Sequence, residues 1–277
     1  MRDVSLTPYY QDASCTLYHG DCRDILPQLD AVDHLISDPP FSADVYIRAS
    51  AVYSKTGSGT PKRMGLSEQK RRGGALQKMA NGDIGEMTTA LMAVIGIWAT
   101  SAVRRWSVVF SDVESCNEWR SALSGLRYVR TGAWVKPNAM PQMSGDRPAV
   151  GFEPCTICHA QGPMRWNGGG KPALWIHNIS SGSSRPEHPC PKPESLMRDL
   201  VMDFTDEGET ILDPFAGSGT TGVAAKRLGR QAILVEREAT FCQLIARRLA
   251  ATTFERRLLP SKNIRGKQID WLKEQPA

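Results

Sequence analysis

The sequence predicts an α/β protein with a doubly wound, mostly parallel β-sheet. Short apolar runs alternate with longer amphipathic segments over most of the 277 residues, which is the order expected when helices cover both faces of a parallel sheet. An apolar content of 41% is enough for the full core of one large domain. One apolar run, residues 210–213, leads directly into a glycine-rich turn and a helical segment.

Seven segments have the pattern of strands and five have the pattern of helices. The predicted strands cover residues 16–18, 34–37, 107–111, 132–135, 150–159, 210–213 and 232–235. The predicted helices cover residues 87–103, 116–125, 195–204, 220–228 and 238–257. A basic stretch at 44–83 and a Gly-, Trp- and Pro-rich stretch at 164–191 do not fit this alternation. Segments that a compact sheet does not need commonly carry recognition.

The strand predicted at 34–37 is followed by Asp38-Pro39-Pro40-Phe41. Proline fixes φ and has no N–H to donate, so two in succession end the strand and begin a stiff turn. Taken alone, this stretch indicates a strand end followed by a turn. Whether Asp38 and Phe41 also have a chemical role depends on the rest of the chain.

The strongest local signal is the stretch T-I-L-D-P-F-A-G-S-G-T-T-G at residues 210–222. Because glycine has no side chain, the backbone N–H groups of this stretch are accessible, and together with the helix N-terminus they point toward a bound ligand. About twenty residues after Gly217, Glu236 ends the next predicted strand, where a carboxylate can bind ribose hydroxyls. The sequence therefore predicts a cofactor that contains adenosine.

The glycine spacing also satisfies G-x-G-x-x-G through Gly217, Gly219 and Gly222, a weak pattern that leaves nicotinamide binding as an alternative. The preceding Asp213 and Phe215 argue against it. A carboxylate there suits a ligand with an ammonium group and would repel a pyrophosphate, and the ring can lie over an adenine or near a sulfonium.

The positive charge is concentrated in one segment. The net charge of the chain is +5, whereas residues 55–78 contain seven basic residues and one acid, so this segment is +6 and the remainder −1. The seven are Lys55, Lys62, Arg63, Lys70, Arg71, Arg72 and Lys78. Such a basic, glycine-rich stretch is typical of a flexible loop that contacts a polyanion such as a nucleic-acid backbone.

The seven cysteines are expected to be free thiols of a cytoplasmic protein. Cys155, Cys158 and His159 have the spacing of a haem attachment or of half a zinc site, with His188 and Cys190 as conceivable partners. A strand at 150–159 would send residues three apart to opposite faces, so we expect no metal. The longest apolar run, at 90–99, is too short to span a membrane, and residues 1–4 lack a signal-peptide core.

Together, the two signatures at 38–41 and 213–220 resemble those of the amino-methyltransferases of DNA. These enzymes methylate N6 of adenine or N4 of cytosine with S-adenosylmethionine. The first signature precedes the second, as in the circularly permuted β class of the family. Further pieces match in the same order over about residues 17–248: Gly20-Asp21-Cys22, Trp134-Val135-Lys136-Pro137, and His188-Pro189 with Lys192-Pro193.

The resemblance implies a circularly permuted seven-stranded sheet of the class I methyltransferase type with one antiparallel hairpin. Residues 1–277 would form a single catalytic domain, with the basic flexible loop at 44–83 and a small target-recognition region at 138–191. The predicted DNA contacts are the seven basic residues of the loop together with Lys136 and Arg185. The tryptophans Trp166 and Trp175 lie in the same recognition region.

The resemblance also implies the chemistry of the first signature. Asp38 and the carbonyl of Pro39 would accept hydrogen bonds from the exocyclic amino group, freeing its lone pair to attack the methyl group in line. Pro40 would hold the turn rigid, and Phe41 would stack on the base after it flips out of the duplex. These four residues are the predicted catalytic residues.

The cofactor site implied by the resemblance draws on both signatures. Asp21 and the backbone of Cys22 would lie near the adenine, Glu236 near the ribose, and Lys192 near the carboxylate of the methionine moiety. The full predicted set is Asp21, Cys22, Asp38, His188, Lys192, Asp213, Phe215, Gly217, Ser218, Gly219, Thr220, Thr221 and Glu236. For His188 and Lys192, an exposed turn before the helix at 195 is an equal alternative.

Adenine is the expected base because the signature begins with Asp, whereas most N4-cytosine enzymes have Ser there. Related RNA and release-factor enzymes carry a similar signature after the cofactor loop, not before it. A cytosine-C5 enzyme would need a nucleophilic cysteine, and Pro154-Cys155 and Pro189-Cys190 do not follow the cofactor loop. A DNA-binding protein without catalysis is a further alternative, against which the intact Asp38-Pro39-Pro40-Phe41 argues. The apolar helix at 87–103 could support a homodimer, but packing of this helix in the core is the favoured interpretation.

Overall fold

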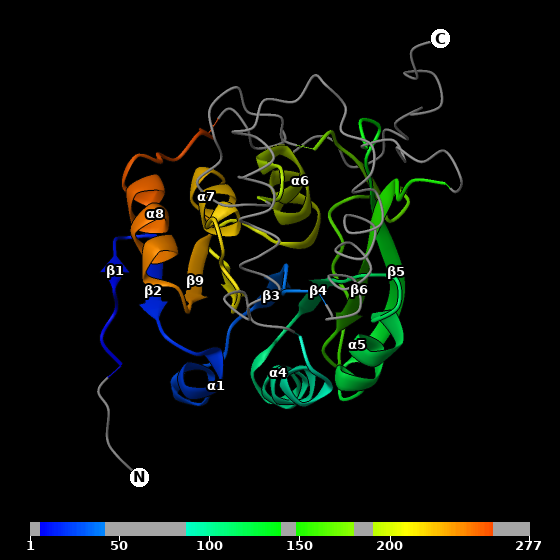
Figure 1. Ribbon diagram of the computed structural model, residues 1–277, viewed down its shortest axis with the longest axis horizontal. Helices are drawn as coiled ribbons and strands as arrows, with labels where there is room; N and C mark the ends of the chain where they lie inside the picture. The colour runs from blue at the N-terminus through cyan, green and yellow to red at the C-terminus, as the bar shows by residue number, and fades with distance from the viewer. Residues whose placement is uncertain (1–5, 42–86, 140–147, 180–190, 257–277) are drawn as a thin grey trace, which may run out of the picture.

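The computed structural model describes residues 6–41, 87–139, 148–179 and 191–256. In this part of the chain, nine strands form one sheet in the order β1-β2-β9-β8-β3-β4-β6-β5-β7 (Figure 1). The strands are β1 (Tyr10–Gln11), β2 (Cys15–His19), β3 (His34–Ser37), β4 (Trp106–Phe110), β5 (Arg127–Val135), β6 (Phe152–His159), β7 (Leu174–Ile176), β8 (Thr210–Asp213) and β9 (Gln231–Glu236).

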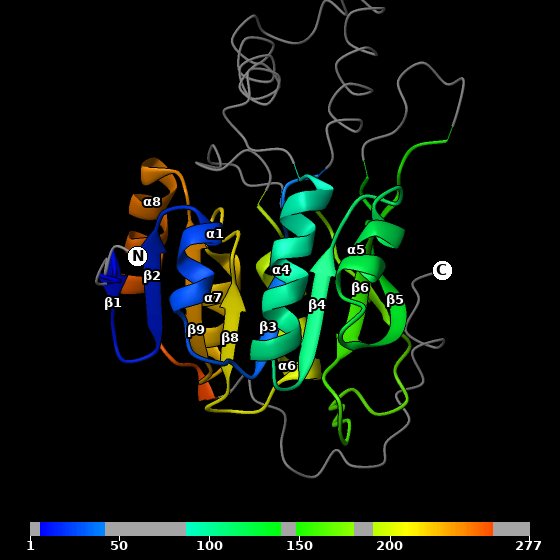
Figure 2. The same ribbon diagram turned by 90° about the horizontal axis from the view of Figure 1, so that it is seen from below.

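Helices cover both faces of the sheet. They are α1 (Cys22–Ile25), the 3-10 helix η1 (Leu26–Gln28), α4 (Thr89–Ala102), α5 (Cys116–Ala122), α6 (Glu194–Phe204), α7 (Thr220–Arg227) and α8 (Ala239–Ala250). Figure 2 shows α1, α4 and α5 in front of the sheet, with α6, α7 and α8 behind it. Apolar residues form one core cluster on each side of the sheet: Leu200 and Val223 belong to one, Ile95 and Trp119 to the other. The predicted doubly wound α/β class is confirmed.

The central strands β2, β9, β8, β3 and β4 are parallel to one another. Strand β6 is antiparallel to both β4 and β5, and its pairing with β5 is the expected hairpin. Because β6 runs backwards, its first residues lie at the edge where β3, β4 and β8 end. That edge carries the candidate site.

The prediction of seven strands and one hairpin was too simple. The seven predicted strands are β2, β3, β4, β5, β6, β8 and β9, and the sheet has two more, β1 and β7, one at each edge. Strand β1 forms a second antiparallel hairpin with β2. The added strands have two and three residues, too few to show the alternation by which a strand is found in a sequence.

The last predicted helix ends earlier than expected. Helix α8 stops at Ala250, whereas the pattern predicted helix to residue 257. Thr252 Oγ1 donates a hydrogen bond to the carbonyl of Arg248 at 2.7 Å, the kind of local side-chain bond that competes with helical hydrogen bonding. The short helix α1 was not predicted at all.

The placement of Cys155 and Cys158 on opposite sides of β6 is confirmed. Cys155 lies in the core cluster that includes Leu200 and Cys158 in the one that includes Ile95. Among the described helices, none has the length and apolar content that a membrane span requires. The basic loop predicted at 44–83 lies outside the described residues.

Candidate active site

The two signatures meet at the carboxyl edge of the sheet because β3 and β8 are adjacent and parallel. His34 pairs with Ile211 and Leu35 with Leu212, so Asp38 follows β3 at nearly the level where Asp213 ends β8. The prediction that these two strands lie side by side is confirmed. Ligands of open α/β sheets bind outside the carboxyl ends of such strands.

Asp213 joins the two signatures through hydrogen bonds. Its Oδ1 accepts from Ser37 Oγ at 2.7 Å and from the Phe215 backbone N–H at 3.1 Å. Its Oδ2 accepts from Thr221 Oγ1 at 2.6 Å. Burial raises the pKa of Asp213, and these hydrogen bonds oppose that rise. The carboxylate therefore connects β3, β8 and α7. The sequence analysis did not anticipate its hydrogen bond with Ser37.

The glycine loop between β8 and α7 adopts a conformation that favours glycine. Gly217 and Gly219 have φ angles of +53° and +76°, in the left-handed region that L side chains rarely adopt. A Cβ atom on Gly219 would lie 2.9 Å from Ile245 Cγ2. Arg248 supports the loop from α8 because its guanidinium donates to the carbonyl of Ser218 and, at 3.3 Å, to Thr220 Oγ1. The sequence analysis missed Arg248.

Glu236 lies beside this loop at the end of β9. It is 8% exposed, its Oε2 accepts from the Gly217 N–H at 2.8 Å, and its Oε1 accepts from the Glu238 N–H at 2.8 Å. Burial raises its pKa, and the two backbone donors oppose that rise. The sequence predicted a carboxylate at this strand end, and the structure places it directly against the loop backbone.

Asp21 and Cys22 follow β2, the next strand along the edge, and begin α1. Strand β2 pairs with β9 so that His19 lies opposite Glu236, and the Gly20 N–H donates to the Glu236 carbonyl at 2.9 Å. Asp21 caps α1 by accepting from the Arg23 N–H at 2.9 Å, while Cys22 is buried. The predicted adenine and ribose residues therefore follow two neighbouring strands.

Asp38 is ion-paired with Lys192. The Lys192 ammonium lies 2.5 Å from Asp38 Oδ1 and 2.8 Å from Glu153 Oε2. The lysine side chain is 9% exposed, so its alternative interpretation as part of an exposed turn is wrong. The contacts of Lys192 in this structure are with protein carboxylates. Its expected contact with a methionine carboxylate stays a prediction.

Three aromatic rings surround the Lys192 ammonium. Its nitrogen lies 5.0 Å from the ring centroid of Phe110 and 5.6 Å from those of Phe41 and Trp134. Ring faces attract cations at such distances. Phe41, which follows the two prolines, therefore lies close to the Asp38 carboxylate.

The protein environment changes the ionisation of Asp38. Burial raises the pKa of Asp38 to about 6, although the positive charge of Lys192 opposes the rise. The negative charges of Glu153 and Asp213 raise it further. A carboxyl group with such a pKa is mostly ionised at pH 7 and can accept hydrogen bonds there.

Glu153 is a charged residue of the site that the sequence analysis missed. It lies near the start of β6, and it also pairs with Lys136, which follows β5. Lys136 was predicted to contact DNA, but its side chain is 11% exposed and its ammonium lies 4.7 Å from the Trp134 ring centroid. Its charge is therefore directed to Glu153 inside the protein. The signal in the sequence was a lone glutamate at the start of an otherwise neutral strand.

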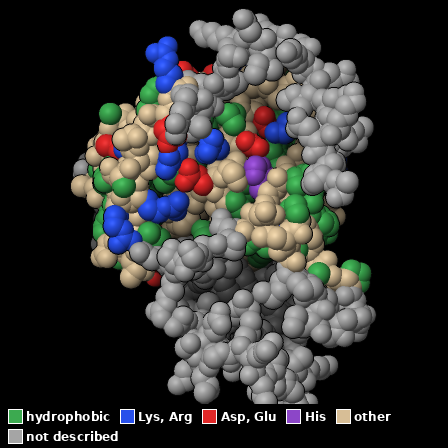
Figure 3. Space-filling model, turned by 90° about the horizontal axis from the view of Figure 1, so that it is seen from above, with side chains coloured by type: hydrophobic (Ala, Val, Ile, Leu, Met, Phe, Trp, Pro, Cys, Tyr) green, Lys and Arg blue, Asp and Glu red, His purple; other side chains and the backbone are tan. Residues whose placement is uncertain are grey.

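Other predicted site residues fall into two groups. Ser218, Thr220 and Thr221 are buried around the start of α7, and Pro39 is buried behind the turn. His188, Arg185 and the seven basic residues between 55 and 78 lie outside the described residues. On the side of the sheet covered by α6, α7 and α8, the described basic and acidic side chains are interspersed (Figure 3).

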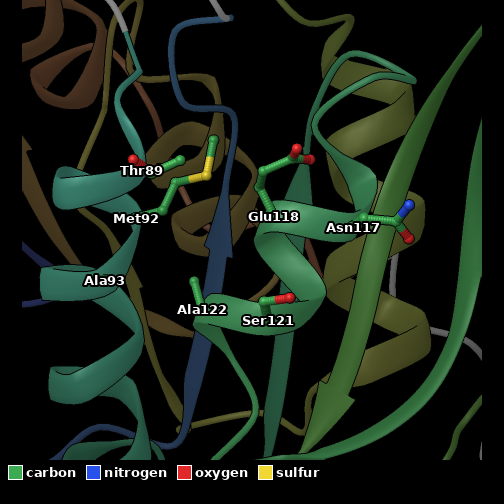
Figure 4. Close-up of a pocket in the computed structure, with 7 residues that line it drawn as sticks. All are labelled: Thr89, Met92, Ala93, Asn117, Glu118, Ser121 and Ala122. Carbon is green, nitrogen blue, oxygen red and sulfur yellow. The ribbon is translucent and has the colours of Figure 1, made fainter.

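A shallow pocket of about 400 Å³ lies between α4 and α5. Figure 4 shows its lining side chains on these two helices: Thr89, Met92, Ala93, Asn117, Glu118, Ser121 and Ala122. None of them belongs to either signature.

Comparisons with known proteins agree with this geometry. A family model described as DNA methylase, of the N6/N4 type, matches residues 123–247. The type II methyltransferase M2.DpnII of Streptococcus pneumoniae is 49% identical over 65 residues, which is 24% of either chain. M2.LlaDCHI of Lactococcus lactis subsp. cremoris is 26% identical over an alignment that covers 87% of this chain and 91% of the relative.

Solved structures share the fold. The M1.HpyAVI–SAM complex has a TM-score of 0.59 at 24% identity and covers 85% of this chain and 98% of its own. The cytosine-N4-specific PvuII DNA methyltransferase has a TM-score of 0.63 at 15% identity, with 87% and 88% of the two chains covered. The adjacent signatures at the strand ends, the family model that spans the glycine loop and the similarity to M2.LlaDCHI together support a DNA amino-methyltransferase.

Proposed function

We propose that the protein transfers the methyl group of S-adenosylmethionine to N6 of an adenine flipped out of duplex DNA. The observation that carries this proposal is the position of Asp38-Pro39-Pro40-Phe41 beside the glycine loop, with β3 and β8 paired in parallel. An acceptor carboxylate, a rigid turn and an aromatic ring then lie next to a loop suited to an adenosine-containing cofactor.

The residues at the strand ends fit such a cofactor. Glu236 offers a buried carboxylate to the ribose hydroxyls. Gly217 and Gly219 place no side chain in the loop, and Asp21 follows the adjacent strand β2. The cofactor would supply a methyl group made electrophilic by the sulfonium that carries it. Phe215, half-buried after Asp213, supplies a ring for the adenine or the sulfonium.

The role of the chain is to activate and orient the target amino group. The lone pair of an exocyclic amine is delocalised into the base, so two acceptors for its hydrogens favour the pyramidal, nucleophilic form. Asp38 would provide one through its carboxylate and Pro39 the other through its carbonyl. Phe41 would stack on the flipped base, a contact worth roughly 1–3 kcal/mol. Positioning and electrostatics then carry the step without a covalent enzyme intermediate.

DNA binding is proposed to depend on the basic segment at 55–78. Its net charge of +6 suits the phosphate backbone, and the inward-facing Lys136 makes this segment more important. Deleting residues 54–78 should weaken DNA affinity and reduce the dependence of affinity on salt, by a slope of about 0.9 for each phosphate that the protein no longer neutralises. Unchanged affinity and salt slope would exclude the segment from DNA binding.

The base is tested by identifying the methylated product. The protein is incubated with S-adenosylmethionine and unmethylated duplex DNA, the DNA is digested to nucleosides, and the products are separated by mass spectrometry. We expect N6-methyladenine, because the signature begins with Asp, and we expect none with Asp38→Ala. N4-methylcytosine would preserve the proposed chemistry and overturn the choice of base. No methylated nucleoside from any duplex DNA would overturn the proposed function.

A further inference from the structure

We infer that Glu153 is a positioning residue for Asp38, acting through the shared Lys192 ammonium. The inference deepens the proposed function and rests on it, because the role of Asp38 as hydrogen-bond acceptor belongs to that proposal. Glu153 belongs to neither signature and lies 115 positions from Asp38 in the sequence. Only the antiparallel direction of β6 brings it to the edge where β3 ends.

The geometry is a row of alternating charges. Asp38, Lys192, Glu153 and Lys136 follow one another through ion pairs, and Lys192 contacts one oxygen of each neighbouring carboxylate. The four residues come from four segments: the end of β3, the turn before α6, β6 and the turn after β5. Two negative and two positive charges make the row neutral, as a poorly solvated cluster requires.

Glu153 controls how strongly Lys192 acts on Asp38. With Asp38 as its sole partner, the ammonium would hold that carboxylate in a full ion pair and weaken it as an acceptor for a base amino group. Glu153 shares the ammonium at 2.8 Å and adds a negative charge close to Asp38, which favours the more basic carboxylate. It also fixes the lysine, since Glu153 is itself held by Lys136.

The charged groups that act on Asp38 come from three segments of the chain. Lys192 precedes α6, Glu153 lies on β6 and Asp213 ends β8, and each acts on the ionisation of Asp38. Removing Glu153 and removing Lys192 should therefore change that ionisation in opposite directions. A residue that only maintained the fold would not produce this pair of opposite shifts.

The test compares pH profiles of kcat/KM for DNA methylation, which report groups of the free enzyme. Glu153→Gln should move the acid limb to lower pH by about one unit. It should lower the plateau about threefold, because a less basic acceptor is less effective. Lys192→Met should move the acid limb to higher pH. Glu118→Gln, an exposed residue at the start of α5, makes the same charge change elsewhere and should leave the profile unchanged.

A second variant covers the case in which Glu153→Gln does not fold. The double variant Glu153→Gln, Lys136→Met removes one charge of each sign and leaves the Asp38–Lys192 pair neutral. It should still move the acid limb to lower pH, because Glu153 is the nearer of the two removed charges. If the acid limb stays in place in a folded Glu153 variant while the unaltered protein still methylates DNA, the inference about Glu153 is overturned and the proposed function is not.

A readout without catalysis separates this inference from the proposed function. The Asp38 carboxyl can be titrated by NMR in protein labelled with ¹³C-aspartate, and Asp38→Asn identifies its signal. If the unaltered protein methylates no DNA, the proposed function fails, and the titration still decides the coupling. A lower midpoint in Glu153→Gln supports control of Asp38 by Glu153, and an unchanged midpoint overturns it.

Discussion

Replacing Gly219 by alanine tests why the cofactor loop has its sequence. The residue has a φ angle of +76°, and its Cβ would lie 2.9 Å from Ile245 Cγ2 and 3.0 Å from Ile245 Cγ1. Two penalties therefore act at one position. An L residue must adopt a left-handed conformation, and its methyl group must displace a side chain of α8 that is fully buried.

The size of the effect follows from these two terms. The left-handed conformation costs roughly 1–2 kcal/mol, and overpacking a tight site costs about 1–3 kcal/mol. Gly219→Ala should therefore lower the free energy of unfolding by about 2–5 kcal/mol. It should also weaken S-adenosylmethionine binding, because the neighbouring Gly217 N–H is held by Glu236 at 2.8 Å.

Urea denaturation of the unaltered protein, Gly219→Ala, Ile245→Ala and the double variant separates the two terms. Ile245→Ala removes both contacting γ-carbons, so Gly219→Ala in that background should cost only about 1–2 kcal/mol. Gly170→Ala is the matched control, because its Cβ meets nothing within 4 Å and its φ is not positive. It should be neutral or stabilising by up to about 1 kcal/mol. A Gly219→Ala protein as stable as the unaltered one would refute the reasoning about the loop.

Three further predictions concern the charged groups. Because burial raises the pKa of Asp38 to about 6, kcat/KM for methyl transfer at pH 5 should be about one tenth of its plateau; an undiminished value at pH 5 would contradict this ionisation. Thr221→Val removes the donor to buried Asp213 Oδ2 and should destabilise the protein by about 1–3 kcal/mol in urea denaturation, so equal stability would argue against that bond. Lys171→Met removes the 2.6 Å ion-pair partner of Asp203, whose pKa burial raises. An acid whose pKa is raised in the folded state favours folding below its unfolded pKa and loses that contribution as pH rises. The variant should therefore be more destabilised at pH 7 than at pH 4. A greater destabilisation at pH 4 would contradict this reasoning.

The sequence predicted the parts of the site that are local in the chain. The glycine loop follows its strand directly, and Asp38 follows β3 directly, so each was visible as a short pattern. The meeting of the two strands came from the family resemblance, and the pairing of Leu35 with Leu212 confirms it.

The contacts that the sequence did not predict join residues far apart in the chain. Lys192 meets both Asp38 and Glu153 because β6 runs antiparallel and the turn before α6 lies over the same edge. Arg248 reaches the loop from α8. Such contacts depend on how several elements pack together, and residue spacing in one sequence contains no record of that packing. The strands β1 and β7 were missed for another reason, their length.

The measurement that tests the central claim most directly is transfer of a labelled methyl group from S-adenosylmethionine to duplex DNA by the unaltered protein and by Asp38→Asn. Both are assayed at saturating cofactor, so that binding does not limit the rate. The account predicts transfer by the unaltered protein and a rate at least about 100-fold lower for Asp38→Asn, since removing a group that stabilises a transition state commonly costs that much. Transfer by Asp38→Asn at the unaltered rate would contradict the assignment of Asp38 as the acceptor that activates the base.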